Sequence, residues 1–197
     1  MRAAEEFLQE TSSNVEDLLL LLKETGKLVA YYRKLLEHYE LDALTGLPGS
    51  NKFHDFIDGI ENRAAGVGIV FFDVNGLKYY NDTKGHQAGD LLIQKASESL
   101  LHITGKNTTT FRVGGDEFVA VITGCNENVL DAVLTKWREK LAVLNASGDG
   151  IHCSIAAGAA IGADGDNISD VLKLADKRMY DEKKRMKASR GSLPQGL

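Results

Sequence analysis

The sequence predicts an α+β fold, in which a palm-like or ferredoxin-like antiparallel sheet is flanked by helices and preceded by a long N-terminal helix. Residues 1–40 contain no proline and a single glycine, and they keep a helical spacing of apolar residues. The rest of the chain mixes helix-like with strand-like segments. A long connection between its first two strands and a tight hairpin between the next two favour an antiparallel sheet with helices packed on it.

The size and charge of the chain limit the classes of function. Its 197 residues suit one globular domain and an extension, and its net charge of −5 disfavours a general nucleic-acid binder. Cys125 and Cys153 have no metal-ligand spacing and fit a reducing cytosol. The apolar run LLLLL at 18–22 is flanked by charges and is far shorter than the roughly 20 residues of a membrane span. We therefore expect a cytoplasmic protein without a membrane segment in this chain.

The N-terminal helix, residues 1–41, carries apolar or weakly polar residues separated alternately by three and four positions, the a/d seam of a coiled coil. The seam favours a homodimer through this helix. An amphipathic helix folded back on its own domain is the alternative, less favoured because the seam is narrow and charges dominate the other faces. Thr25 and Gly26 weaken the middle of the coil, which suits a signalling linker. The seam consists of Leu8, Thr11, Val15, Leu18, Leu22, Thr25, Val29, Tyr32, Leu36 and Tyr39.

The globular domain, residues 42–187, begins where Gly46, Pro48 and Gly49 break the helix. The periodicity then predicts its elements in order: a helix over 51–62, a strand over 67–74, a helix from about Gly89, two strands at TTTFRV and EFVAVIT, a helix over 128–144, a strand over 151–161 and a helix over 169–187. We expect the tail, residues 188–197, to be loose.

The stretch FRVGGDEFVAV, residues 111–121, places two carboxylates directly after two glycines and between two apolar strands. Glycine accepts the positive φ that tight hairpin turns demand, so the turn is expected to be short and exposed. Asp116 and Glu117 would point to opposite faces if strand geometry begins at once, and would converge if the chain is still twisting. A solvated turn would explain the same pair.

A third carboxylate, Asp73, ends the apolar run VGIVFFDV. A carboxylate at the end of a buried strand is costly unless it binds a cation or hydrogen-bond donors. If the two strands are neighbours, Asp73 lies near the hairpin, and three carboxylates would form an oxygen-rich site for Mg²⁺. Two such ions could support phosphoryl or nucleotidyl transfer.

The loop after Asp73 runs through Gly76 and Lys78 to Asn81 and the segment GHQAGD, residues 85–90. Free backbone amides in a glycine-containing turn can hold phosphate oxygens. Asn and Asp side chains can also meet the edge of guanine, where the Asp accepts from the N1 and N2 donors. Turn formation and helix capping would account for Asn81 and Asp90 equally well.

These motifs together resemble the GGDEF domain, the diguanylate cyclase family. The resemblance rests on DVNGLKYYNDTKGHQAGD followed by RVGGDEF, with DALTGLP (42–48) and ADKRMYDEK (175–183) similar to the opening and closing motifs of the family. It spans roughly residues 42–187, and chance agreement of four motifs in the right order is very improbable.

The resemblance implies condensation of two GTP molecules to cyclic di-GMP across a homodimer, with loss of two pyrophosphates. One of the acids would assist deprotonation of the 3′-hydroxyl. A solvated basic face is the alternative for the lysines of the last helix. Carried over by position, the metal ligands for two Mg²⁺ or Mn²⁺ are Asp73, the Val74 carbonyl, Asp116 and Glu117, the triphosphate contacts are Leu77, Lys78, Lys183 and Lys187, and the guanine contacts are Asn81 and Asp90.

Some positions depart from the family pattern. The Arg-x-x-Asp motif of product inhibition falls on Gly105–Thr108, so feedback through that site is not expected, and Glu182 and Met186 replace a common Ala and Gly. The alternative function is a catalytically silent module that binds GTP or receives a signal, with an upstream sensor domain as a further partner in either case. A purely structural coiled-coil adaptor ranks last, because it would leave the clustered acids without a shared purpose.

Overall fold

The computed structural model describes residues 2–39, 41–60, 64–148 and 150–191, and the side chains of 14–32, 41–60, 64–148 and 150–189.

The chain divides into two compact units, Met1–Glu40 and Leu41–Leu197. The first unit is a single helix, α1 (Arg2–Tyr39). Along its described side chains the seam residues Val15, Leu18 and Val29 are more than half exposed. Leu19, Leu20, Leu21 and Leu28 are exposed as well, so the apolar surface of α1 is wider than the expected seam.

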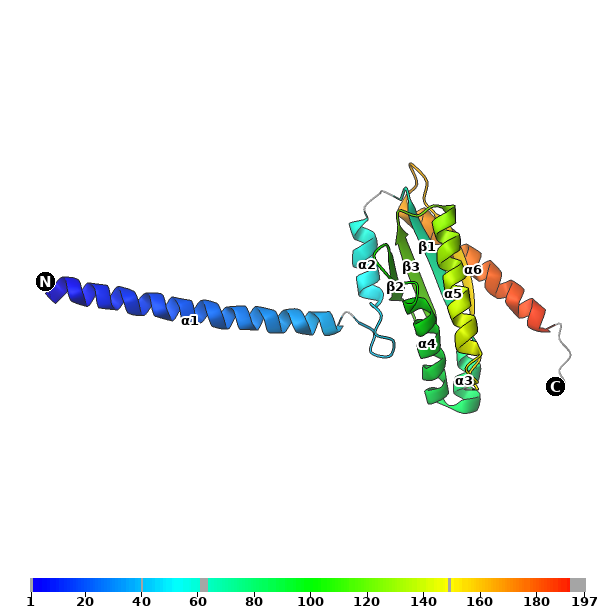
Figure 1. The fold of residues 1–197 in the computed structure, drawn as a ribbon, viewed down its shortest axis with the longest axis horizontal. Helices are drawn as coiled ribbons and strands as arrows, with labels where there is room; N and C mark the ends of the chain where they lie inside the picture. The colour runs from blue at the N-terminus through cyan, green and yellow to red at the C-terminus, as the bar shows by residue number, and fades with distance from the viewer. Residues whose placement is uncertain (1, 40, 61–63, 149, 192–197) are drawn as a thin grey trace. The chain divides into compact units, whose positions relative to one another are not determined.

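The second unit is built on a four-stranded sheet in the order β2-β3-β1-β4, with every neighbouring pair antiparallel. This arrangement confirms the predicted α+β fold with an antiparallel central sheet (Figure 1). The strands are β1 (Val67–Asn75), β2 (Thr108–Arg112), β3 (Glu117–Thr123) and β4 (Ser154–Ile161).

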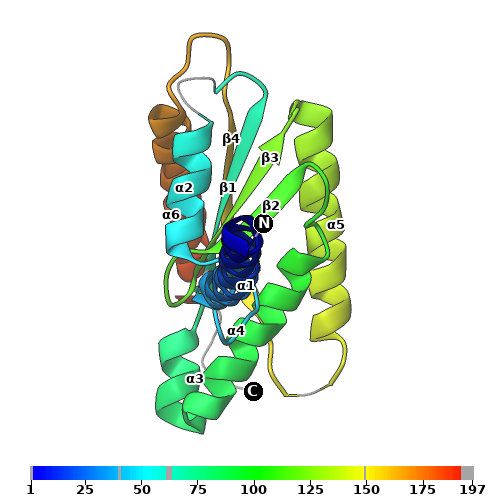
Figure 2. The ribbon, with the colours of Figure 1, turned by 90° about the vertical axis from the view of Figure 1, so that its left-hand side faces the viewer.

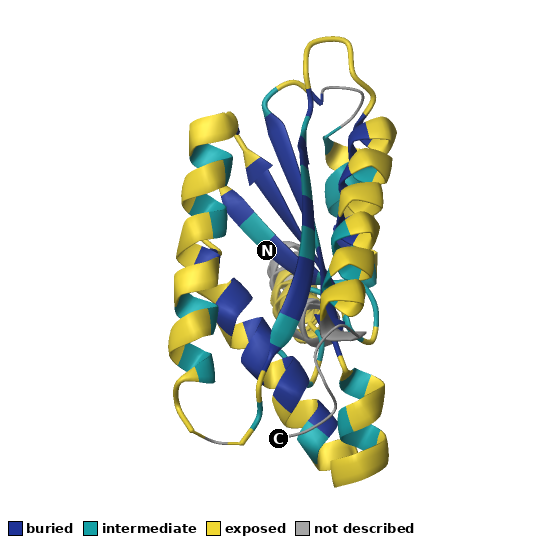
Figure 3. Cartoon of the chain, turned by 90° about the vertical axis from the view of Figure 1, so that its right-hand side faces the viewer, coloured by how far each residue is buried: buried dark blue, intermediate teal, exposed yellow. Residues whose placement is uncertain are grey.

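Helices cover both faces of the sheet (Figure 2). Helices α2 (Ser50–Gly59) and α6 (Ile168–Gly191) lie on one face. Helices α4 (His86–Leu101) and α5 (Glu127–Asn145) lie on the other. The short helix α3 (Leu77–Lys84) follows β1 and packs against α4. With helices on both faces, the two central strands are buried on each side, as Figure 3 shows.

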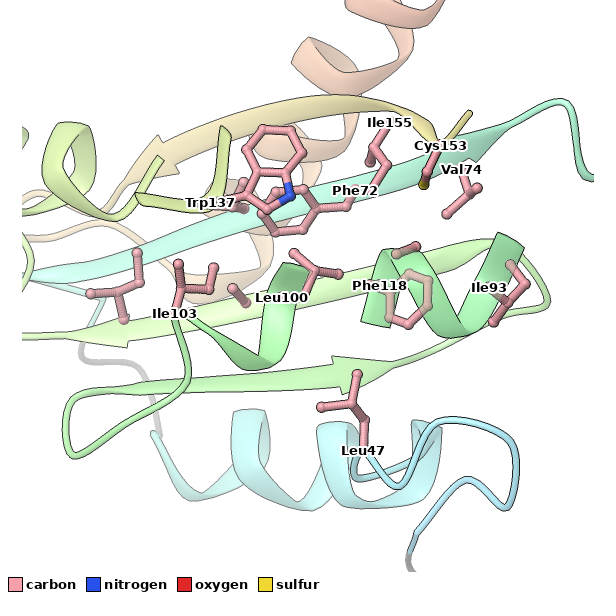
Figure 4. Packing of buried hydrophobic residues seen from close by; sticks show 14 of the residues in the cluster. Leu47, Phe72, Val74, Ile93, Leu100, Ile103, Phe118, Trp137, Cys153 and Ile155 are labelled. Atoms are coloured by element: carbon pink, nitrogen blue, oxygen red, sulfur yellow. The ribbon is translucent and has the colours of Figure 1, made fainter. Parts of the chain in front are cut away.

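Alternation along the strands divides the core into two layers. On the α4/α5 side, Phe72 and Phe118 are fully buried and the Trp137 ring lies edge-on to Phe72, with centroids 4.8 Å apart (Figure 4). On the α2/α6 side, Ile69 and Val119 pack with residues of the flanking helices. Residues 69, 71 and 73 of β1 share this second face, so Asp73 continues the row that faces α6.

Helix α6 crosses β4 at very short range. A Cβ added at Gly158 would stand 1.9 Å from the backbone nitrogen of Met179 and 2.4 Å from the carbonyl oxygen of Ala175. Only glycine fits at this crossing, because the atoms in the way belong to the helix backbone. The close approach sets how far the later turns of α6 reach over the sheet.

Several predicted boundaries differ from the structure. Helix α3 occupies residues that the sequence placed in a loop, and α4 begins at His86 rather than near Gly89. Strand β4 begins at Ser154 rather than at residue 151, because residues 151–153 lead into the strand without strand geometry. Helix α6 extends to Gly191, so residues 188–191 of the expected loose tail are helical, and residues 192–197 lie outside the described part.

Candidate active site

Two of the predicted site carboxylates are direct neighbours across the sheet. Asp73, near the end of β1, pairs with Glu117, the first residue of β3, in the antiparallel register. Directly paired residues point to the same face of a sheet, here the face covered by α6. Asp73 is buried whereas Glu117 is exposed, so the pair extends from the protein interior to the surface.

Asp116 contributes to the site differently from Glu117. It lies in the turn before β3, and its carbonyl oxygen accepts a hydrogen bond from the Val74 N–H at 2.8 Å. This bond continues the β1–β3 ladder by one residue and holds the turn against the end of β1. No three Asp, Glu, His or Cys side chains within the described ranges form a group suited to holding a metal ion. The structure thus pairs two carboxylates and does not show the expected convergence of three.

The structure contradicts the positive-φ role predicted for the hairpin glycines. Neither Gly114 nor Gly115 is among the glycines with positive φ, so the turn does not need that backbone conformation. A Cβ at Gly114 would instead stand 2.6 Å from Oε2 of Glu117 and 3.2 Å from its Cβ. Glycine at position 114 therefore leaves room for this position of the Glu117 side chain, which folds back over it.

Lys183 from α6 reaches the buried end of this pair. Its Nζ lies 2.5 Å from Oδ2 of Asp73, and the Asp73 side chain is only 5% exposed. The other oxygen, Oδ1, is buried without a hydrogen-bond partner among the described residues. Burial raises the pKa of Asp73; the hydrogen bond and charge of Lys183 oppose this rise, and the charge of Asp116 adds to it.

The pKa of Glu117 is raised as well. Burial is the largest cause, followed by the negative charges of Asp116, Asp73 and Asp176, while Lys183 acts in the opposite direction. Asp176, on the outer side of α6, was not among the predicted site residues. The raised pKa values therefore reflect burial first and the negative charge of neighbouring acids second, and a bound cation would stabilise the charged form of both groups.

The donor chemistry fits a divalent metal ion. Carboxylate and carbonyl oxygens are the hard ligands that Mg²⁺ prefers. A buried carboxylate oxygen without a donor, such as Asp73 Oδ1, is the kind of atom that a cation would bind.

Beyond β1 the chain makes a turn suited to an anion. Gly76 adopts a left-handed conformation with φ of 86°, and α3 begins immediately after it at Leu77. The first backbone N–H groups of a helix lack partners within the helix, so they can donate to phosphate oxygens. Leu77 packs against the core, whereas the side chain of Lys78 is exposed.

The contact between α3 and α4 places Asn81 against Gly89, the residue before Asp90. A Cβ on Gly89 would stand 1.9 Å from Oδ1 of Asn81 and 3.1 Å from a methyl carbon of Leu77. The Asn81 side chain therefore rests on the bare backbone of Gly89, next in sequence to the exposed Asp90.

Lys187 is exposed one turn beyond Lys183, and its charge lowers the pKa of Asp73.

Arg112 is a supporting residue that the sequence analysis missed. Its Nη1 contacts Oδ1 of Asp42 at 2.8 Å, and its Nε and Nη2 donate to the carbonyls of Gly114 and Gly115. The sequence offered one signal for this contact: Arg112 stands two residues before the glycines, and Asp42 is the one acid in DALTGLP.

No helix in the described part of the chain is long and apolar enough to cross a membrane.

Comparison with known proteins gives consistent relatives. The chain is 30% identical over 146 residues to the cyclic di-GMP phosphodiesterase PdeR of Escherichia coli K12, covering 72% of this chain and 22% of PdeR. It is 27% identical over 190 residues to the diguanylate cyclase DosC of the same strain, covering 90% of this chain and 41% of DosC. The chain thus spans well under half the length of these relatives.

The solved structures agree on the fold. The coiled coil and GGDEF domain of DgcB from Caulobacter crescentus, in complex with c-di-GMP, superposes with a TM-score of 0.74 at 22% identity, covering 85% of this chain and 92% of that one. The FimX GGDEF domain from Pseudomonas aeruginosa has a TM-score of 0.63 at 19% identity, covering 74% and 94%. The family model described as diguanylate cyclase, GGDEF domain, matches residues 39–189. The chain therefore belongs to the GGDEF-domain family of diguanylate cyclases.

Proposed function

We propose that this chain is an active diguanylate cyclase, which condenses two GTP molecules into cyclic di-GMP. In each half-reaction the 3′-oxygen of one GTP attacks the α-phosphate of the other, a phosphodiester bond forms, and the bond to pyrophosphate breaks. The observation that carries the proposal is the Asp73–Glu117 pair at the end of β1, with the Lys183 ammonium beside it. A transfer between polyanionic substrates needs such a site, where acids hold cations and a lysine meets phosphate.

Each group of residues has a role in this proposal. Held by Asp73, the Val74 carbonyl, Asp116 and Glu117, two Mg²⁺ or Mn²⁺ ions would stabilise the leaving pyrophosphate and make the 3′-hydroxyl more acidic. The backbone at Leu77 and Lys78, with the Lys183 and Lys187 side chains, would hold the triphosphate. Asn81 and Asp90 would read the guanine edge, where Asp90 accepts from N1 and N2.

A homodimer is part of the proposal. Two loaded sites must face each other for each 3′-oxygen to reach the opposite α-phosphate in line. We propose that the N-terminal helix, residues 1–41, pairs two chains as a coiled coil and that residues 42–187 form the GGDEF cyclase domain. The exposed seam residues Val15, Leu18 and Val29 support this pairing, because a helix with such a stripe is stable when a second helix covers it.

A silent GTP-binding or signal-receiving module is the second candidate. It is favoured by the relative that bears the name of a phosphodiesterase, and by the small share of each relative that this chain spans. The cyclase reading is favoured by the intact acids, since Asp73 and Glu117 are both present and paired.

The first experiment separates these candidates. The purified chain is incubated with GTP and Mg²⁺ or Mn²⁺, and cyclic di-GMP is sought by mass spectrometry, with Asp116→Ala as the control. Product from the wild type alone supports the cyclase. GTP binding without product, persisting when the N-terminal helices are joined by an engineered disulfide, supports the silent module.

The guanine assignment has its own test. Asp90→Ala removes the proposed acceptor for the N1 and N2 donors, and adenine lacks that donor pattern. We expect weaker GTP binding and a smaller preference over ATP in a competition assay. An unchanged GTP/ATP preference contradicts the role of Asp90.

A further inference from the structure

The contact between Lys183 and Asp73 joins two groups that the proposed function assigns to different ligands. Lys183 is assigned to the triphosphate, and Asp73 to a metal ion. In the structure they contact each other, with Nζ 2.5 Å from Oδ2. Their side chains are 24% and 5% exposed, so this ion pair lies at the inner end of the site.

The ion pair has a clear physical cause. A carboxylate buried as deeply as Asp73 is strongly destabilised without a counter-charge. Glu117 is its direct partner across the sheet, and the negative charge of nearby Asp116 raises the pKa of Asp73. Lys183 is the cation that offsets this charge, with a smaller contribution from Lys187.

A metal ion at Asp73 would compete with Lys183. Only Oδ1 of Asp73 is without a partner, so an ion bound there would share one carboxylate with the ammonium group. A divalent ion on Oδ1 and the Lys183 ammonium group on Oδ2 of the same carboxylate would repel each other strongly in a partly buried site. The lysine stem is flexible and the side chain is partly exposed, so Lys183 can move outward along α6.

We propose that Lys183 is a placeholder cation, which neutralises Asp73 before a divalent metal ion binds and then moves to the triphosphate of the incoming nucleotide. The inference rests on the proposed metal and triphosphate sites, and it goes further by giving one side chain both positions. It makes metal and nucleotide binding interdependent: the metal releases Lys183 from Asp73, and the phosphates stabilise Lys183 once it is released. The coupling is reciprocal, so each ligand raises the affinity for the other by the same factor.

The test measures Mn²⁺ affinity by the electron paramagnetic resonance of free Mn²⁺, with the full chain at pH 8. The variant is Lys183→Met, which keeps the length of the side chain and removes its charge. The matched control is Lys187→Met, one helical turn away and exposed. The nucleotide is 3′-deoxy-GTP, which lacks the attacking hydroxyl and therefore cannot react.

We expect Lys183→Met to bind Mn²⁺ about tenfold more tightly than the wild type without nucleotide, within the usual range of coupling between ligands. The Lys187→Met variant should change this affinity much less. The nucleotide should tighten Mn²⁺ binding to the wild type and have a smaller effect on Lys183→Met. Unchanged or weaker Mn²⁺ binding by a folded Lys183→Met variant overturns the inference.

A second measurement uses the wild type alone and remains valid if the variant is unstable. Acetylation of Lys183 and Lys187 is followed by mass spectrometry at limiting reagent. We expect Lys183 to react more slowly than Lys187 at first, faster when Mg²⁺ is added, and slowly again with Mg²⁺ and 3′-deoxy-GTP. A Lys183 rate that does not respond to saturating Mg²⁺ contradicts the exchange.

These results are separable from those on the proposed function. If the wild type binds no Mn²⁺ even with 3′-deoxy-GTP, the metal site fails, and both the proposed cyclase and the placeholder role of Lys183 fail with it. If coupling through Lys183 is found but no cyclic di-GMP forms, the inference holds for a silent GTP-binding module.

Discussion

Arg112 and Asp42 connect the start of the globular unit to the hairpin that carries the acids. Nη1 of Arg112 lies 2.8 Å from Oδ1 of Asp42, while the same guanidinium donates to the carbonyls of Gly114 at 3.2 Å and Gly115 at 2.7 Å. Burial raises the pKa of Asp42, but hydrogen bonds from Thr45 and Arg112 outweigh that effect and lower it. Arg112 therefore holds the first residues of the globular unit against the turn that leads into β3.

Replacing Arg112 should weaken both the fold and the site. Arg112→Ala removes the counter-charge of the partly buried Asp42, which keeps its hydrogen bonds from Thr45, and the side-chain donors to two turn carbonyls. This should cost about 1–3 kcal/mol of unfolding free energy. Arg112→Lys should retain little of this stability, because the three donors of an ammonium group share one nitrogen and cannot reach acceptors that the guanidinium contacts through three separate nitrogens. Denaturant unfolding and cyclic di-GMP synthesis measure the two effects. Lys173→Ala, which breaks an exposed pair with Asp170, is the control and should cost less than about 0.5 kcal/mol.

The two hairpin glycines offer a matched pair of substitutions. Gly114→Ala places a methyl group against Oε2 of Glu117, and the end of that flexible side chain must turn away. We expect the melting temperature to stay nearly constant while cyclic di-GMP synthesis falls by at least about tenfold, the loss typical of a misplaced catalytic group. Gly115→Ala adds a methyl group with nothing within 4 Å and should remain active. Equal activity of the two variants would show that the position of Glu117 does not matter.

Gly89→Ala tests whether Asn81 is held by the backbone beneath it. The new Cβ would stand 1.9 Å from Oδ1 of Asn81, so that side chain must leave its position. We expect GTP to bind about tenfold more weakly, the free energy of roughly one good hydrogen bond. The same substitution made in an Asn81→Ala background should have a much smaller effect, because the displaced group is already gone. Additive losses, measured by calorimetric titration of GTP, would contradict this explanation.

The raised pKa values of Asp73 and Glu117 predict a dependence of stability on pH in the protein without bound metal. A carboxyl group whose pKa is higher in the folded state holds its proton there while the unfolded chain has released its own. Stability therefore falls as pH rises from the unfolded pKa, near 4, through the raised folded pKa, and the full penalty is present above the folded pKa.

Glu117→Gln should accordingly raise the melting temperature at pH 7.5 and change it less at pH 4.5, where the folded wild type holds more of the proton on this carboxyl and carries less negative charge at the site. Glu139→Gln, on the exposed side of α5, is the control for removing a surface charge. Added Mg²⁺ should stabilise the wild type more than Glu117→Gln, because it relieves the repulsion at this site. Differential scanning fluorimetry across the pH range measures all three. A larger stabilisation at pH 4.5 than at pH 7.5 would mean that the pKa of Glu117 is not raised.

Local patterns in the sequence determined much of the architecture. The apolar runs ending at Asp73 and flanking the hairpin identified three strands, and the short separation of the last two identified the antiparallel β2–β3 hairpin. The pairing of β1 with β3, which places Asp73 beside Glu117, was only a condition in the sequence analysis and was decided by the tertiary structure. The order of the motifs identified the family. These inferences succeeded because strand alternation and hairpin turns depend on residues close together in the chain.

Other features were decided only by the tertiary structure. The contact of Lys183 with Asp73 joins residues 110 positions apart, and it depends on how far α6 reaches after crossing β4 at Gly158. Arg112 meets Asp42 across 70 positions for a similar reason. Glycine at position 114 leaves room for the Glu117 side chain, which folds back over its backbone. The positive-φ explanation was wrong, because the sequence does not show where the Glu117 side chain lies. Such contacts depend on the crossing of packed elements and on side-chain direction, which no local pattern encodes.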